Sequence, residues 1–239
     1  QGLIAGINAA RKLQGKEGIV IDRSQGYIGV LIDDLVTKES HEPYRMMTSR
    51  AEYRLLLRQD NADMRLTKIG YEVGLIDEER YQKLLKKEEM IEKEIERVEH
   101  TNVGTTEAVQ ALLESYESTP LTSGTTLAEL IRRPELSYEK IAPIDKHREE
   151  LPYDVKEQVD INIKYDGYIK RQMRQVEQFK KLENKRIPEN INYDEIQSLR
   201  LEAKQKLNKI RPSSIGQASR ISGVSPADVS VLLVYLSSK

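Results

Sequence analysis

The 239-residue chain contains no cysteine and only three histidines. The absence of cysteine excludes a disulfide framework, a thiolate metal site and a cysteine nucleophile within this chain. His41, His100 and His147 are far apart in the sequence, so their spacing does not support a histidine-based metal site. Paired acids such as Asp33 and Asp34 are common on protein surfaces. We therefore expect no metal centre here.

Long hydrophobic runs and nucleotide-binding signatures are also missing. The most apolar uncharged run, Val229–Leu236, is far shorter than the ~18 residues that a membrane span needs. The patterns GxGxxG, GxxxxGK[ST] and HExxH do not occur. Residues 1–6 lack the basic segment of a signal peptide and an initiator methionine, and they enter an apolar helical pattern with no capping residue. We infer that the chain is a fragment cut within a helix.

Charge is abundant and unevenly distributed. Charged residues make up 32% of the chain and hydrophobic residues 38%, which indicates an elongated, mainly α protein with a modest core. Residues 1–163 hold 23 basic and 31 acidic residues, a balance of −8, whereas residues 164–239 hold 15 and 8, a balance of +7. Such opposite halves favour a polyanionic or acidic partner for the basic half. An ordinary solvated surface is the alternative.

The periodicity of apolar residues predicts mostly helices. Residues 1–14 form a helix with a stripe of small residues, and residues 77–99 form one strongly charged helix with a narrow apolar seam. Residues 153–184 are interpreted as one long helix, although Val159–Tyr165 alternate as a strand would. Its later half is basic. Short extended segments are expected near the N-terminus, at residues 18–21 and 43–48.

A group of five arginines distinguishes residues 45–65. The segment from Ser49 to Glu52 fits a capping box. In this motif the serine oxygen accepts a hydrogen bond from a free backbone amide of the first turn, and the glutamate side chain accepts one from the backbone amide of the serine. The helix expected after it would place Arg50, Arg54 and Arg58 on one face. Guanidinium groups bind phosphates bidentately and stack on bases, so these side chains, with Arg45 and Arg65, indicate contact with phosphate or nucleic acid. Ion pairs with neighbouring acids are the alternative, but Glu52, Asp60 and Asp63 are too few to neutralise all five.

The last fifty residues predict a three-helix unit that resembles a helix–turn–helix. Its helices are expected at residues 194–209, 214–221 and 226–236, the last one capped by Ser225 with proline in its first turn. This last helix has almost no polar face, whereas a DNA-recognition helix needs side chains that reach base edges. Burial in its own core or against a protein partner explains it better.

Several long stretches resemble the C-terminal part of the bacterial MnmG/GidA family of tRNA wobble-uridine modification enzymes. The matching residues, in order along nearly the whole chain, are Gln1–Ala10, Glu42–Met46, Thr48–Leu55, Asp60–Asp63, Arg65–Thr67, Lys164–Tyr165, Gly167–Ile169 and Ser214–Val224. Runs of this length are far more specific than any short pattern. Residues 100–150 match only loosely.

The resemblance implies a FAD-dependent enzyme that, together with a GTPase partner called MnmE, adds a carboxymethylaminomethyl or aminomethyl group to the wobble uridine of tRNA. NADH and methylenetetrahydrofolate are the family's co-substrates, and a cytoplasmic homodimer is expected. The family's dinucleotide-binding glycines and catalytic cysteines lie upstream of these residues, so the resemblance implies no catalytic residue in this fragment, which we expect to be inactive alone. It assigns flavin contact to Gln1, Gly2 and Gly6.

The resemblance and the charge pattern together give an expected role to each region. Residues 1–40 would be the tail of the FAD-binding domain, residues 41–190 a helical tRNA-binding region and residues 191–239 a unit that docks the GTPase. The expected tRNA contacts are Arg45, Arg50, Arg54, Arg58, Arg65, Lys170, Arg171, Arg174, Lys180 and Lys181. The expected partner contacts are Ile215, Arg220, Ile221, Val229, Leu232, Leu233 and Leu236. A non-enzymatic helical RNA-binding or adaptor module is the alternative function.

Overall fold

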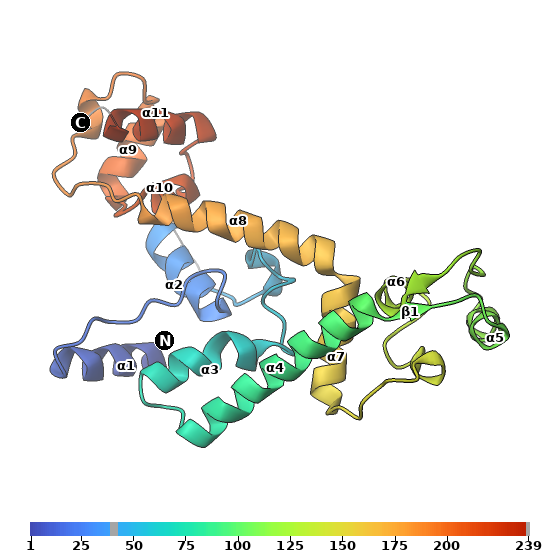
Figure 1. The fold of residues 1–239 in the computed structure, drawn as a ribbon. Helices are drawn as coiled ribbons and strands as arrows, with labels where there is room; N and C mark the ends of the chain where they lie inside the picture. Colours follow the sequence, from blue (N-terminus) through green and yellow to red (C-terminus); the bar gives the residue numbers. More distant parts are fainter. Residues whose placement is uncertain (39–42, 238–239) are drawn as a thin grey trace. The chain divides into compact units, whose positions relative to one another are not determined.

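The structure, a computed structural model, describes residues 1–38 and 43–237. Within these residues it contains eleven α-helices and one antiparallel pair of two-residue strands, β1 (Asn102–Val103) and β2 (Thr125–Thr126) (Figure 1). The mainly α prediction is confirmed. His41 and the domain boundary expected at that position lie outside the described residues.

The chain forms two compact units that differ in continuity. Unit 2 is one uninterrupted segment, Arg58–Lys170, whereas unit 1 combines Gln1–Leu57 with Arg171–Lys239. The helices of unit 2 are α3 (Ala62–Glu72), α4 (Glu78–His100), α5 (Glu107–Ser115), α6 (Leu127–Ile131) and α7 (Tyr153–Lys164).

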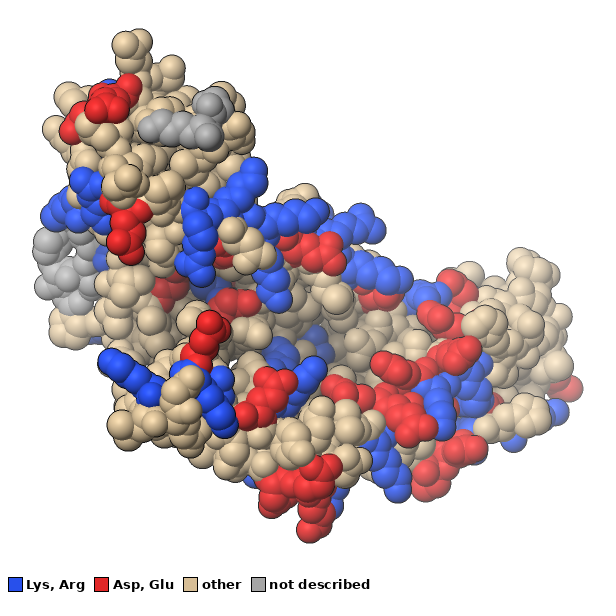
Figure 2. All heavy atoms as spheres, turned by 60° about the vertical axis from the view of Figure 1, so that its left-hand side comes forward, with Lys and Arg blue, Asp and Glu red and all other residues tan. Residues whose placement is uncertain are grey.

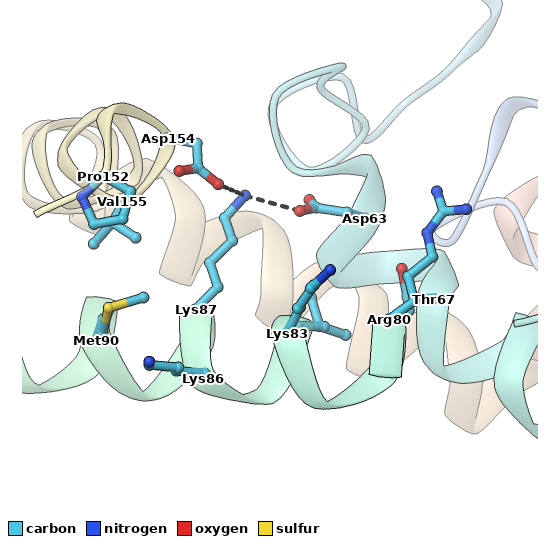
Figure 3. A pocket seen from close by; sticks show the side chains of 11 residues that line it. Asp63, Thr67, Arg80, Lys83, Lys86, Lys87, Met90, Pro152, Asp154 and Val155 are labelled. Atoms are coloured by element: carbon cyan, nitrogen blue, oxygen red, sulfur yellow. Dashed lines mark hydrogen bonds and ion pairs between the residues drawn. The ribbon is translucent and has the colours of Figure 1, made fainter. Parts of the chain in front are cut away.

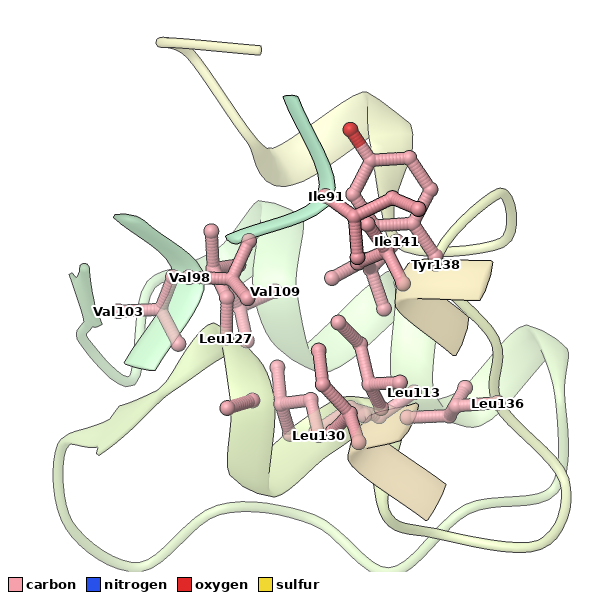
Figure 4. Packing of buried hydrophobic residues seen from close by; sticks show 14 of the residues in the cluster. Ile91, Val98, Val103, Val109, Leu113, Leu127, Leu130, Leu136, Tyr138 and Ile141 are labelled. Atoms are coloured by element: carbon pink, nitrogen blue, oxygen red, sulfur yellow. The ribbon is translucent and has the colours of Figure 1, made fainter. Parts of the chain in front are cut away.

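The core of unit 2 is built around α4. The predicted apolar seam is confirmed, because Leu84, Ile91 and Val98 are buried at heptad spacing. Asp77 caps the helix by accepting a hydrogen bond from the backbone amide of Arg80 at 2.8 Å. This face packs against α3, α6 and α7. Farther along, side chains of α5, α6 and the segment after α6 join those of α4 and β1 in the cluster drawn in Figure 4, and Leu113, Leu127, Leu130 and Ile141 among them are fully buried.

The predicted single helix over residues 153–184 is wrong in one respect. Two helices follow each other, α7 and α8 (Asp166–Asn184), separated by Tyr165, whose φ of −105° and ψ of 12° leave helical geometry. On α7, Val155, Val159 and Ile163 are buried at a spacing of four. The same spacing reaches Gly167 next, which has no side chain to bury, so the buried face of α7 ends there. The strand-like alternation produces no strand.

Unit 1 contains α1 (Gly2–Leu13) and α2 (Tyr27–Thr37) followed, after α8, by a bundle of α9 (Leu201–Ile210), α10 (Ile215–Arg220) and α11 (Pro226–Ser237). The three-helix prediction for the last fifty residues is therefore confirmed. Its last cap is also as expected, since the Asp228 amide donates to Ser225 Oγ at 3.3 Å and the Asp228 carboxylate accepts the Ser225 amide at 2.8 Å.

The first helix of this bundle is shorter than predicted. It begins at Leu201 rather than Asp194, after a 3₁₀ turn at Tyr193–Glu195 and a loop. The loop side chains Ile196 and Leu199 are buried together with Tyr193. An irregular backbone brings these closely spaced apolar residues into one core, which overrides their helical propensity.

The expected extended segments near the N-terminus form no strand in the described residues, since residues 18–22 and 43–47 have no regular structure. Residues 21–22 nonetheless lie very close to α2. A Cβ added to Gly29 would stand 2.3 Å from the carbonyl oxygen of Asp22, so only glycine allows α2 to approach this backbone.

Candidate nucleic-acid interface

From Arg171 onward, α8 presents cations to solvent. Arg171, Arg174, Lys180 and Lys181 are exposed, and Lys185 and Arg186 continue the row beyond the helix. Within the described part of the chain, Lys180 has only a long ion pair with Asp22 at 3.8 Å, and the other five have no ion pair. Figure 2 shows Lys and Arg side chains gathered over this helix. Lys170, the residue before Arg171, forms an ion pair with Asp166 at 2.9 Å.

Besides Asp166, α8 contains two acids, and they offset this row only partly. Glu183 is engaged inside unit 1, where it accepts a hydrogen bond from Ser214 at 2.8 Å and pairs with Arg220. Only Glu177 remains exposed among the cations. The row of α8 therefore carries a net positive charge that the described residues do not neutralise, which suits a polyanion.

The helix predicted after Ser49 is wrong. Residues 48–50 form a single 3₁₀ turn (Thr48–Arg50) and irregular backbone follows, so Arg50, Arg54 and Arg58 do not share a helical face. The reason is tertiary. Glu52 does not reach back to Ser49, because its carboxylate instead accepts hydrogen bonds from the buried guanidinium of Arg23, the shortest at 2.7 Å.

A buried ionic network holds this segment. The Arg23 side chain, only 2% exposed, also binds Asp33 at 2.9 Å and Asp34 at 2.7 Å on α2. Asp34 in turn accepts a hydrogen bond from the Tyr44 hydroxyl at 2.8 Å. Burial alone would raise the pKa of Asp34, but hydrogen bonds from Lys38, Arg23 and Tyr44 outweigh it and lower the pKa. The aspartate thus stays ionised and fixes the segment.

Three of the five arginines are carried by this segment of unit 1. Arg45 and Arg54 are exposed and have no ion pair within the described residues. The Arg50 guanidinium lies over the Tyr44 ring, 4.4 Å from its centroid, and 3.9 Å from Asp34. Arg45 and Arg54 can therefore bind a phosphate without first breaking an ion pair within the described residues.

The other two arginines belong to unit 2 and are half-buried. Arg58 pairs with Asp60 at 3.0 Å and donates to the Gln158 side chain at 3.3 Å. Arg65 donates to the Asn61 side chain at 2.9 Å and to the carbonyl of Arg58 at 3.0 Å. The Arg58–Asp60 pair is one that the ion-pair alternative expected, and the contacts of Arg58 and Arg65 together stabilise the start of unit 2.

A second group of cations, which the sequence did not single out, lines a cavity of about 480 Å³ in unit 2 (Figure 3). Its central side chain, Lys87, is buried and bridges Asp63 at 2.8 Å and Asp154 at 3.0 Å. Burial acts to lower the pKa of Lys87, but these two carboxylates outweigh it and raise the pKa. Lys87 therefore joins α3, α4 and α7 in a structural role. The sequence feature that could have indicated the burial of Lys87 is its position within the apolar seam of α4, between Leu84 and Ile91.

The residues predicted to contact a partner lie mostly inside the terminal bundle. Ile215, Ile221, Val229 and Leu232 are buried in its core, and Leu233 and Leu236 are half-buried against it. Because these four side chains are buried inside the bundle, the expectation that they contact a partner directly is corrected. The alternative reading, burial in the bundle's own core, accounts for them.

Arg220 is also directed inward. Its guanidinium binds the Asp33 carboxylate at 2.6 Å, pairs with Glu183 and lies over the Phe179 ring. On α11, the side chain of Val234 is 69% exposed, and it lies beside Val231 and Tyr235.

The residues assigned to flavin contact do not form a cofactor cradle by themselves. Gln1, Gly2 and Gly6 are exposed, and a Cβ added to either glycine would meet no atom within 4 Å. No side chain caps α1, and none of its residues is buried. These three residues alone therefore do not enclose a flavin, and their contact with one stays a prediction. In the described ranges, no three acidic or histidine side chains are placed to hold a metal ion.

Two family models match the chain and define its class. Residues 78–173 match the model described as "tRNA modifying enzyme MnmG/GidA C-terminal helical domain", and residues 175–239 match "tRNA modifying enzyme MnmG/GidA C-terminal helical bundle". The chain thus contains the helical domain and the helical bundle that these two models describe. It belongs to the MnmG/GidA family.

Relatives and solved structures agree with this assignment. The chain is 70% identical over 99% of its length to the tRNA uridine 5-carboxymethylaminomethyl modification enzyme MnmG of Lachnoclostridium phytofermentans, and 64% identical to that of Caldicellulosiruptor saccharolyticus. It spans 38% of the length of each. The structure of Aquifex aeolicus GidA in its form II crystal matches with a TM-score of 0.82 at 42% identity, covering 99% of this chain and 37% of that one. No helix among the described residues is long and apolar enough to cross a membrane.

Proposed function

We propose that this chain supplies the tRNA-binding and partner-binding portion of a FAD-dependent enzyme. That enzyme would add a carboxymethylaminomethyl or aminomethyl group to the wobble uridine of tRNA in the cytoplasm. It would act as a homodimer with the GTPase MnmE and use NADH and methylenetetrahydrofolate as co-substrates. Catalysis would reside outside these 239 residues. The observation that carries the proposal is the exposed, unneutralised row of cations on α8.

The row on α8 suits RNA because its charges are exposed and mostly unpaired. An arginine or lysine that already has an acidic partner gains little from a phosphate, since the first interaction must be given up. Arg171, Arg174 and Lys181 have no such partner among the described residues. Arg45 and Arg54 in unit 1 meet the same condition and extend the list of proposed contacts.

The test is a salt series of tRNA binding. Each cation that neutralises a phosphate contributes roughly 0.7 to 0.9 to the slope of log affinity against log salt. Replacing Arg171, Arg174 and Lys181 with glutamine should therefore reduce the slope by about 2 and weaken binding. The matched control replaces Lys83, Lys93 and Arg132, which are surface cations already paired with glutamates. An equal effect of both triple variants would show that net charge alone, and not α8, binds tRNA.

A second function, docking of the GTPase, is supported by the exposed apolar side chains of the terminal bundle. Val234 on α11 is 69% exposed, and it lines a shallow groove with Val231 and Tyr235. Val234→Asp should abolish GTPase binding while leaving the bundle folded, because the side chain is not part of the core. Leu201→Asp, at an exposed position of α9 outside the groove, is the control. Retained GTPase binding in Val234→Asp would place the partner elsewhere.

A further inference from the structure

The junction between α7 and α8 exposes two tyrosines whose hydroxyls and rings are unused. Tyr165 is 45% exposed and Tyr168 is 67% exposed. Neither makes a side-chain hydrogen bond or a ring contact within the described residues. Tyr165 immediately precedes α8 and Tyr168 lies in its first turn, so both exposed rings belong to one short segment of the chain. Both rings are therefore accessible to a ligand.

Gly167, between the two tyrosines, adds a second observation. It lies in the first turn of α8, where glycine costs about 1 kcal/mol relative to alanine. Packing does not require it, because a Cβ added there would meet no atom within 4 Å. Its φ is not positive either, so the backbone does not require it. What glycine leaves is a bare patch of backbone beside two exposed rings, which a flat group can approach closely.

The charges around the junction are positive or already neutralised. Lys164 is engaged with Asp160 at 3.7 Å and with the carbonyl of Leu136, and Asp166 is engaged with Lys170 at 2.9 Å. Along the same helix, Arg171 follows Tyr168 by one turn and has no ion pair in the described residues. An aromatic ring next to an unpaired arginine suits a base with its flanking phosphate better than an apolar protein surface.

We propose that Tyr165, Gly167 and Tyr168 form a stacking platform for an unpaired nucleobase of the bound RNA. This inference rests on the proposed RNA binding by α8 and adds what kind of RNA feature is bound there. A base that is paired within a duplex presents no free face to a tyrosine, so the platform discriminates single-stranded loops from helices. The cations of α8 bind phosphates of either kind.

The experiment compares two RNAs against the 239-residue chain. One is a stem–loop with 2-aminopurine in a seven-nucleotide loop, and the other is a duplex of the same stem without unpaired bases. Tyr168→Leu should weaken binding of the stem–loop about tenfold and abolish the quenching of 2-aminopurine, with duplex binding unchanged. Tyr168→Phe should keep both, because stacking needs the ring and not the hydroxyl. Gly167 has open space around it, and Gly167→Leu should weaken binding of the stem–loop and abolish quenching as Tyr168→Leu does.

Tyr153→Leu is the matched control. Tyr153 is 77% exposed at the start of α7, beside the acids Glu150 and Asp154, and it should have no effect. Equal losses for stem–loop and duplex in Tyr168→Leu, or unchanged binding of both, would overturn the platform while leaving RNA binding by α8 intact. If the unaltered chain bound neither RNA, the proposed function itself would fail, and the platform with it.

Discussion

Arg220 in α10 binds the Asp33 carboxylate in α2 through two nitrogens of its guanidinium group. Nε donates to one carboxylate oxygen at 2.7 Å and Nη2 to the other at 2.6 Å, across 187 positions of sequence. Burial acts to lower the pKa of Arg220, but Asp33 and Glu183 outweigh it and raise the pKa. The guanidinium is thus charged at every accessible pH, and the pair joins the two sequence segments of unit 1.

Removal of this arginine should loosen unit 1. Arg220→Met leaves Asp33 and Glu183 with one cation fewer in a largely buried site, and breaking such a pair costs about 3 kcal/mol. Hydrogen exchange should show faster exchange of amides in α2 and α10 and no change in α4. Lys93→Met, which removes an exposed pair with Glu89, should leave exchange unaltered. Unchanged protection in Arg220→Met would mean that apolar packing alone joins the segments.

The terminal bundle should lose stability in acid through Asp228. Hydrogen bonds from Arg200 and Ser225 outweigh the effect of burial and lower the pKa of this carboxylate. A carboxylate with a lowered folded-state pKa stabilises the fold above its unfolded pKa, about 3.9, and this stabilisation is lost as the pH falls toward the folded value. Thermal melting should therefore show the bundle weakening below about pH 4.

Asp228→Asn separates this effect from general acid unfolding. The variant should be less stable than the original chain at pH 7, and its stability should change less between about pH 4 and pH 2. Parallel pH profiles of the two proteins would show that Asp228 does not contribute to acid sensitivity.

Arg54 and Arg58, which the sequence grouped together, should behave differently. Arg54→Gln should reduce the salt slope of tRNA binding by about 0.8 without a change in stability, because Arg54 is exposed and has no ion pair in the described residues. Arg58→Gln should lower the melting temperature of unit 2, because it removes the contacts with Asp60 and Gln158. Identical effects of the two substitutions would contradict their placement in this structure.

Two glycine-to-alanine substitutions should have opposite signs. Both glycines lie in helices, where alanine is favoured by up to about 1 kcal/mol. Gly6→Ala should stabilise α1 because its Cβ meets no atom. Gly29→Ala should destabilise unit 1 by about 2 kcal/mol or more, since its Cβ would collide with backbone oxygens of Ile21 and Asp22. The melting temperatures of the two variants, compared with that of the original chain, test this prediction. An unchanged melting temperature in Gly29→Ala would show that α2 can move away from this backbone.

The elements that sequence predicted well are those in which local signals and burial agree. α4 has an N-cap, a regular seam and a charged outer face, and each of these is realised. The cap of α11 at Ser225 was equally predictable, because a cap depends on neighbouring residues. The basic row of α8 was visible for the same reason, since an exposed face needs no tertiary contact to be recognised.

The errors arise where a distant residue decides the local structure. No pattern near Ser49 reveals that Glu52 belongs to Arg23, twenty-nine positions earlier, and this contact removes the expected helix. Similarly, Arg220 looked like a surface cation of the bundle until Asp33 was found to bind it. The basic row expected on α8 is exposed in the structure, whereas in the arginine segment pairing decides which charges remain available. Contact of either group with tRNA stays a prediction.

The discontinuity of unit 1 has a consequence for biosynthesis. Unit 2 is one continuous segment, so all of its residues have been made once Lys170 has left the ribosome. Asp33 of unit 1, in contrast, meets its partner Arg220 only 187 positions later in the sequence. Residues 1–57 are therefore without part of their packing partners while unit 2 is made, and a chaperone would protect them during that time.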